Sequence, residues 1–238
     1  MFERHLAWLV ETCEVIPFRR LLSAAAEERK RPAVAITFDD GYADNHEYAL
    51  PLLKQYNAPA TIFVTAGFVA GDRQVYSRFC ELRETSGAEL RALSWEQARE
   101  LRAEGIEIGA HTYGHPNLAR LDREQARREL EVPKEMLEDR LGTQVDLFAY
   151  PFGKPRRHFD DTTLRLVDGA GYRHAAAVVS RAVRASDSPL AVPRFFATGD
   201  SVEDLAAKIR GDLDYLAVWQ EHAPLALAKV VSPGDFRF

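Results

Sequence analysis

The chain has 238 residues, of which 31 are Lys or Arg and 36 are Asp or Glu, so its formal net charge at pH 7 is −5. This acidic balance argues against nucleic acid or an anionic membrane as the main partner. Apolar residues at 46% and charged residues at 28% are ordinary for a globular protein, and the length is within the range of one α/β barrel. We therefore expect a single domain over residues 1–238, whose oligomeric state the sequence leaves open.

No membrane-spanning or secretory segment is recognisable in the sequence. No apolar stretch approaches the roughly 20 residues that a helix needs to cross a bilayer. The first ten residues lack the cationic start and the long apolar centre of a signal peptide. Two cysteines, Cys13 and Cys80, are too few for a disulfide framework. As it stands, the chain is expected to be cytoplasmic.

Helical and strand-like segments alternate along the first half of the chain. Apolar residues at helical spacing or in short β-rich runs predict helices over residues 2–10, 18–26 and 45–56 and strands over residues 33–38 and 60–65. Pro51 is expected to mark a kink or boundary in its helix. Residues 68–92 show no clear period and predict an irregular excursion, which could shape a substrate groove.

The second half continues the alternation and carries two helix-start signals. Ser94 with Gln97, and Asp122 before the longest helical run, are typical N-caps. Pro133 is expected to kink or divide that long helix. The predicted elements are helices over residues 95–104, 123–141, 160–170 and 201–219 and strands over residues 106–110, 145–150, 172–179 and 190–196. Repeated βα units of this kind predict an α/β fold with a parallel sheet.

Two polar motifs follow predicted strands directly. Asp39, Asp40 and Gly41 end the first apolar strand, and His111 and His115 follow another strand about seventy residues later. In open α/β sheets and in α/β barrels, the carboxyl ends of the strands form the active site. The two histidines can face the same way if residues 111–115 make a single helical turn. One carboxylate and two imidazoles form the ligand set of a catalytic divalent metal, and the second carboxylate is then free to deprotonate water.

These motifs resemble those of the NodB-type polysaccharide deacetylases (carbohydrate esterase family 4). The family's first motif is similar to Thr-Phe-Asp-Asp-Gly at residues 37–41, and its second to His-Thr-Tyr-Gly-His at residues 111–115. Its third is similar to Phe-Ala-Tyr-Pro-Phe-Gly at residues 148–153, in a variant that resembles the poly-N-acetylglucosamine deacetylase branch. The resemblance extends from about residue 33 to residue 196. It implies a distorted (β/α)7 barrel that could lack an N-terminal strand.

The resemblance also implies roles for individual residues. Asp39 would be the general base, and Asp40, His111 and His115 would bind a divalent metal, with zinc expected and cobalt, nickel or iron as alternatives. Because Pro151 has no N–H, the backbone donor to the oxyanion would be Tyr150 or Phe152, and we favour Phe152. Tyr113, Tyr150 and Pro151 are candidate substrate contacts, since amphipathic rings suit carbohydrate faces.

The sequence departs from the family pattern at two functional positions. Where many members carry an arginine that orients the base, this chain has Ala149, and Arg194 is the candidate to supply that charge from a later strand end. The late histidine that acts as general acid is missing, and neither His158 nor His174 is a convincing substitute. In the similar branch an early strand carries the acid. Either this chain lacks that strand, or the sequence starts at an internal Met, in which case an export signal could precede it.

We therefore predict a metal-dependent hydrolase that removes N-acetyl groups from an N-acetylglucosamine-containing glycan or sugar conjugate. Two alternatives stay open. One is hydrolysis of a non-polymeric amide, including a formamide. The other is a glycan-binding pseudoenzyme that retains the metal and lacks the general acid.

Overall fold

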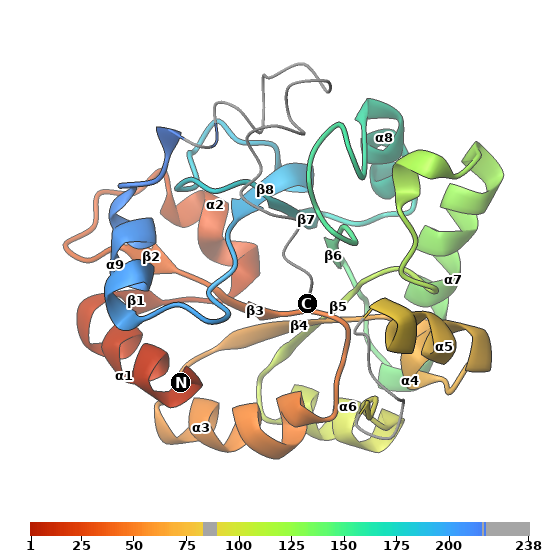
Figure 1. Ribbon diagram of the computed structural model, residues 1–238, viewed down its shortest axis with the longest axis horizontal. Coiled ribbons are helices and arrows are strands. Elements are labelled where there is room, and N and C mark those ends of the chain that lie inside the picture. Colours follow the sequence, from red (N-terminus) through yellow and green to blue (C-terminus); the bar gives the residue numbers. More distant parts are fainter. Residues whose placement is uncertain (83–89, 216, 218–238) are drawn as a thin grey trace.

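The computed structural model describes residues 1–82, 90–215 and 217, and its helices surround a curled parallel sheet (Figure 1). The α-helices are α1 (Phe2–Thr12), α2 (Leu21–Ala24), α3 (Leu50–Gln55), α4 (Ala66–Val69), α5 (Arg73–Leu82), α6 (Trp95–Ala103), α7 (Arg123–Leu141), α8 (Asp161–Gly169) and α9 (Val202–Arg210). Short 3-10 turns are η1 (Phe18–Arg20), η3 (Leu118–Arg120) and η4 (Pro189–Ala191), and η2 (Asn45–Ala49) is a π-helix. None of the described helices is long and apolar enough to cross a membrane.

The main sheet has six parallel strands in the order of the chain. They are β3 (Ile36–Phe38), β4 (Ala60–Val64), β5 (Glu107–Ala110), β6 (Leu147–Ala149), β7 (His174–Val178) and β8 (Val192–Arg194). A separate pair joins β1 (Glu14–Val15) to β2 (Ala33–Val34), also in parallel. The large sheet is a half-barrel with helices outside it, as in a distorted (β/α)7 barrel, so the predicted fold class is confirmed.

Alternate residues of the central strands enter two different hydrophobic clusters. In β4, Ile62 and Val64 pack in the larger cluster, whereas Phe63 belongs to a smaller one with Leu147 and Phe18. This alternation is the consequence of the two-residue period of a strand with both faces covered. Because both faces of these strands are covered, their sequences are continuous apolar runs. Because the strands are parallel, the polar residues that follow them lie at one common rim of the sheet.

The strand predicted over residues 33–38 is divided between the two sheets. Residues 33–34 pair with β1, and residues 36–38 pair with β4. The chain changes partner at Ala35. The pairing with residues 14–15 is a tertiary contact that the local apolar pattern could not specify.

Both predicted N-caps are present, at the starts of α6 and α7, and each is part of a capping box. The side chains of Ser94 and Asp122 accept the backbone N–H of Gln97 and Gln125, whose side chains bond back to the caps. The expected division at Pro133 is wrong, because α7 runs through it as one helix. A proline removes one helical hydrogen bond, and the buried face of α7 packs on both sides of it, at Ala126, Leu130, Leu137 and Leu141.

Two predictions in the first half of the chain also differ from the structure. The helix expected over residues 45–56 is a π-helix followed by α3, with Pro51 in the first turn of α3, so the predicted boundary is confirmed. The irregular excursion over residues 68–92 contains α5, which Asp72 caps by accepting the N–H groups of Gln74 and Val75 at 2.8 and 3.1 Å. Its two buried residues, Val75 and Phe79, form too short an apolar pattern to show a period.

The last helix is also shorter than predicted. It ends at Arg210, because Gly211 adopts a left-handed conformation at φ 84° and closes the helix as a C-cap. Residues 216 and 218–219 of the predicted helix lie outside the described residues. The strand expected over residues 190–196 is likewise reduced to β8, because residues 189–191 form η4.

Candidate metal and catalytic site

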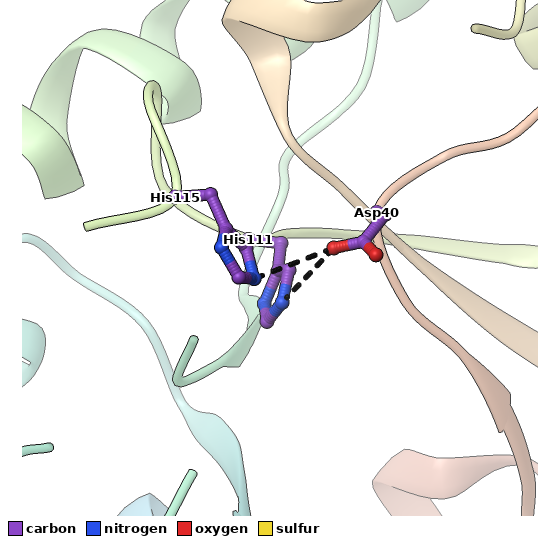
Figure 2. Close-up of side chains that lie close together, drawn as sticks. All are labelled: Asp40, His111 and His115. Atoms are coloured by element: carbon purple, nitrogen blue, oxygen red, sulfur yellow. Dashed lines mark ion pairs between the residues drawn. The ribbon is translucent and has the colours of Figure 1, made fainter. Parts of the chain in front are cut away.

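The side chains of Asp40, His111 and His115 meet at the carboxyl ends of β3 and β5. The Nε2 atoms of His111 and His115 lie 3.6 and 3.4 Å from Oδ1 of Asp40. Figure 2 shows both imidazole rings pointing toward this carboxylate. One possible ligand atom from each residue lies within 4.8 Å of the other two. The structure thus brings the three predicted ligands together.

Left-handed backbone conformations, rather than a helical turn, produce this geometry. The single helical turn expected over residues 111–115 is wrong, because Thr112 and His115 have φ values of 66° and 55°. The N–H of His115 donates to Oγ1 of Thr112 at 2.9 Å, within this irregular loop. Asp40 also has a positive φ, 73°. Non-glycine residues in this conformation carry strain of about 1–3 kcal/mol each, and such strain is concentrated at functional sites.

The orientation of His111 is fixed from the opposite side of its ring. Its Nδ1 lies 2.7 Å from the backbone carbonyl of Ala149 on β6. Since a carbonyl only accepts hydrogen bonds, Nδ1 carries the proton and Nε2 faces Asp40 with its lone pair. Burial is the largest influence on this ring and lowers the pKa of His111, so the neutral form that binds metals is favoured. A backbone carbonyl behind a histidine is a common support for a metal ligand.

The donor set fits a catalytic divalent cation. The three side chains are 2% (His111), 9% (His115) and 14% (Asp40) exposed, so they are shielded from bulk water without being sealed from it. Two imidazoles and one carboxylate are the ligands of catalytic zinc, which keeps one position open for water or substrate. The same set also accepts other divalent transition metals.

Asp39 is held by Arg194, which reaches it from the end of β8. The two terminal nitrogens of Arg194 donate to the two carboxylate oxygens of Asp39 at 2.8 and 2.7 Å, and one of them also donates to Oγ1 of Thr37 at 3.0 Å. Burial raises the pKa of Asp39, but the Arg194 charge, its hydrogen bonds and the two nearby histidines outweigh burial and hold the pKa below its usual value. Asp39 is therefore a carboxylate at neutral pH.

Phe152 borders the site from the loop after β6. Its ring lies 4.8 Å from that of His115, centroid to centroid, and its side chain is 39% exposed. Its φ is 61°, followed by Gly153 at 62°, so the backbone turns sharply here. The N–H of Tyr150 is bonded to the carbonyl of Ala176 at 3.3 Å. The Tyr150 N–H is thus already bonded, and Phe152 stays the predicted donor to the oxyanion.

The three predicted substrate contacts differ from one another in how deeply they are buried. Tyr150 is 1% exposed, stacks on Phe159 at 3.8 Å and donates its hydroxyl to the carbonyl of Leu190, so its side chain packs in the core. Pro151 is buried as well. Tyr113 is half-buried, and its hydroxyl donates to Asp72 at 2.9 Å. The structure does not bring the Tyr150 ring to the metal ligands.

One residue next to the site was missed by the sequence analysis. Glu129 of α7 accepts the backbone N–H groups of Tyr113 and Gly114, which lie between His111 and His115 in the sequence. It stands in a helix rich in charged residues, where a glutamate normally faces solvent. No local signal in the sequence distinguishes it from its charged neighbours.

Comparison with known proteins identifies the family. The family model for polysaccharide deacetylases matches residues 26–175. The chain belongs to the polysaccharide deacetylase family.

Curated relatives are similar over most of this chain and about half of their own length. YxkH of Bacillus subtilis is 29% identical over 175 residues, which are 72% of this chain and 55% of that protein. The poly-beta-1,6-N-acetyl-D-glucosamine N-deacetylase of Staphylococcus aureus is 24% identical over 188 residues, which are 75% of this chain and 59% of the enzyme.

Two solved structures are similar over nearly the whole chain. IcaB from Ammonifex degensii superposes with a TM-score of 0.70 and 28% identity, covering 88% of each chain. The Streptococcus pyogenes deacetylase PplD, solved in complex with acetate, gives a TM-score of 0.72 at 23% identity, covering 87% of this chain and 85% of that one. At that identity, the likeness to PplD shows the common fold.

Proposed function

We propose that the protein is a metal-dependent N-deacetylase that acts on an N-acetylglucosamine-containing glycan or sugar conjugate. The observation that carries this proposal is the position of two carboxylates in different surroundings. Asp40 lies with two histidines, whereas Asp39, the preceding residue, is held as a carboxylate by Arg194. The staphylococcal relative, whose name states deacetylation of poly-N-acetylglucosamine, supports this class of substrate.

Asp40, His111 and His115 would hold the cation, with zinc as the expected metal. A divalent cation bound there would act as a Lewis acid and lower the pKa of its water to about 7. The carbonyl of Ala149 keeps the Nε2 lone pair of His111 directed at that position. Because the chain supplies three ligands, a cation held there would still have room for water.

Asp39 would take the proton from the attacking water, and Phe152 would donate its backbone N–H to the oxyanion. Arg194 donates one hydrogen bond to each oxygen of Asp39, which fixes the orientation of the carboxylate. It also keeps the carboxylate ionised, which is the state that a general base needs. Arg194 thus acts through Asp39 as a positioning residue. The exposed ring of Phe152 offers an apolar surface against which a sugar could pack.

The test is acetate release from N-acetylglucosamine oligomers by protein reconstituted with zinc or cobalt. We expect release by the wild type and a loss of about 10²- to 10⁴-fold in Asp39→Asn, because this variant keeps the shape of the side chain and removes the base. The metal content of both proteins should be equal.

Two other outcomes separate the alternatives. Stoichiometric metal on the wild type without acetate release from any oligomer would support the glycan-binding pseudoenzyme, provided that the oligomers bind. Release of acetate or formate from small amides alone would support an amidase or deformylase. Failure to bind any divalent metal would overturn the proposed mechanism altogether.

A further inference from the structure

Glu129 is a half-buried carboxylate for which the proposed chemistry has no role. It lies on α7, and a single oxygen, Oε2, accepts the N–H of Tyr113 at 3.0 Å and the N–H of Gly114 at 2.8 Å. These two residues belong to the three that separate His111 from His115 in the sequence. Glu129 therefore contacts the backbone that connects the two histidine ligands.

The same loop is also held by the segment between β4 and β5. Arg78 of α5 donates a hydrogen bond to the carbonyl of Gly114. The N–H groups of Ala66 and Gly67 in α4 donate to the carbonyls of Thr112 and Tyr113 at 3.1 and 2.9 Å. Donors from α4 and α5 thus bind the loop carbonyls, whereas the loop N–H groups bind Glu129.

The need for an acceptor follows from the conformation of the loop. A helical turn would have satisfied backbone groups internally, but the left-handed residues Thr112 and His115 prevent that turn. Shielded N–H groups without an acceptor are costly, and a carboxylate is a stronger acceptor than a neutral group. The space is also tight, because a Cβ on Gly114 would lie 3.3 Å from both Arg78 and Glu129.

We propose that Glu129 is a positioning residue that holds the residue 111–115 loop in its metal-binding conformation, with Arg78 assisting through its hydrogen bond to the carbonyl of Gly114. The affinity of the site for a divalent metal then depends on a residue that touches neither the metal nor the substrate. This inference rests on the proposed metal-dependent function.

The experiment measures the affinity of purified, metal-free protein for cobalt and zinc by competition with a chromophoric chelator. We expect Glu129→Leu to bind about 10- to 100-fold more weakly than the wild type, which is the usual effect of removing an outer support of a metal ligand. Glu129→Gln should recover most of the affinity, since one amide oxygen can accept both N–H groups as Oε2 does. The visible spectrum of bound cobalt should be the same in the wild type and the glutamine variant.

Glu138 provides a matched control on the same helix. It is also half-buried, and its Oε1 accepts a loop N–H, that of Val145, at 2.9 Å and the ammonium of Lys134 at 2.8 Å. Glu138→Leu should destabilise the fold without changing metal affinity. Equal losses of affinity in Glu129→Leu and Glu138→Leu would overturn the proposal, because the effect would then be a general weakening of α7.

Two further outcomes would also overturn it. One is wild-type affinity in folded Glu129→Leu, and the other is a glutamine variant as weak as the leucine variant, which would make charge rather than the shared acceptor decisive. If Glu129→Leu does not fold, Arg78→Met tests the proposal in its place. Arg78 is exposed, so this variant should fold, and its metal affinity should fall by a smaller factor than that expected for Glu129→Leu. Absence of metal binding in the wild type would instead refute the proposed function.

Discussion

Arg194 and Asp39 are 155 residues apart in the sequence and form a two-bond ion pair across the open side of the half-barrel. They stand at the ends of β8 and β3, the two edge strands of the sheet, which do not pair with each other. The guanidinium also lies 5.5 Å from the ring of Phe63 and bonds to Thr37. A side-chain bridge therefore joins the edges where a closed barrel would have backbone hydrogen bonds, and it fixes Asp39 in place.

Replacing Arg194 tests whether this geometry matters beyond charge. We expect Arg194→Met to lower kcat by about 100-fold, since a misplacement of about 1 Å in a reacting group can cost that much. Arg194→Lys should be intermediate, because an ammonium keeps the charge and cannot form the planar two-bond contact. The measurement is kcat and KM for an N-acetylglucosamine oligomer at equal metal content. A methionine variant with the wild-type kcat would remove Arg194 from the mechanism.

Metal binding should stabilise the fold, and the free energy of unfolding should rise with the logarithm of the metal concentration once the site is saturated. A ligand present at 100 times its Kd stabilises the native state by about 2.7 kcal/mol, because it binds the folded protein and not the unfolded one. We therefore expect the Tm to rise on addition of zinc or cobalt and to fall again with a chelator. The same titration of Asp40→Ala should show no rise. A rise of equal size in that variant would locate the metal elsewhere.

Gly153 should not tolerate a side chain. A Cβ there would lie 2.6 Å from Cγ2 of Val178 and 3.0 Å from its backbone nitrogen, and the φ of 62° disfavours any L-residue. Gly153→Ala is expected to destabilise the protein by about 1–3 kcal/mol and to displace Phe152, with a loss of activity. Gly169→Ala is the control, since nothing lies within 4 Å of that Cβ and alanine favours the helix by about 1 kcal/mol. Urea unfolding of the two variants gives the comparison.

His158 should make the fold sensitive to mild acid. The pKa of His158 is lowered from 6.5 to about 4, chiefly by burial and further by the charges of Arg157 and Lys154. Because its pKa is lower in the folded state, the unfolded chain binds the proton more readily between these values. Stability is therefore present above about pH 6.5 and is lost as the pH falls toward 4. His158→Gln should flatten this part of the plot of unfolding free energy against pH, and an unchanged slope would contradict the assignment.

The sequence predicted the approximate position of the candidate site residues. Asp39, Asp40, His111 and His115 each follow an apolar run, and parallel strands deliver such residues to one rim of a sheet. The helix starts at Ser94 and Asp122 were also predictable, since a capping box joins residues only three positions apart. These features depend on neighbours in the chain, which is why the sequence alone reveals them.

Only the tertiary structure decided how those residues are held. The loop of residues 111–115 makes no helical turn, and Glu129, Arg78 and α4 bind its backbone groups from outside. Tyr150, a candidate substrate contact, is buried in the core, where its ring stacks on Phe159 and its hydroxyl donates to the carbonyl of Leu190. Contacts of this kind join segments distant in the sequence, and their free energy depends on burial and on the pairing of charges that no local pattern specifies.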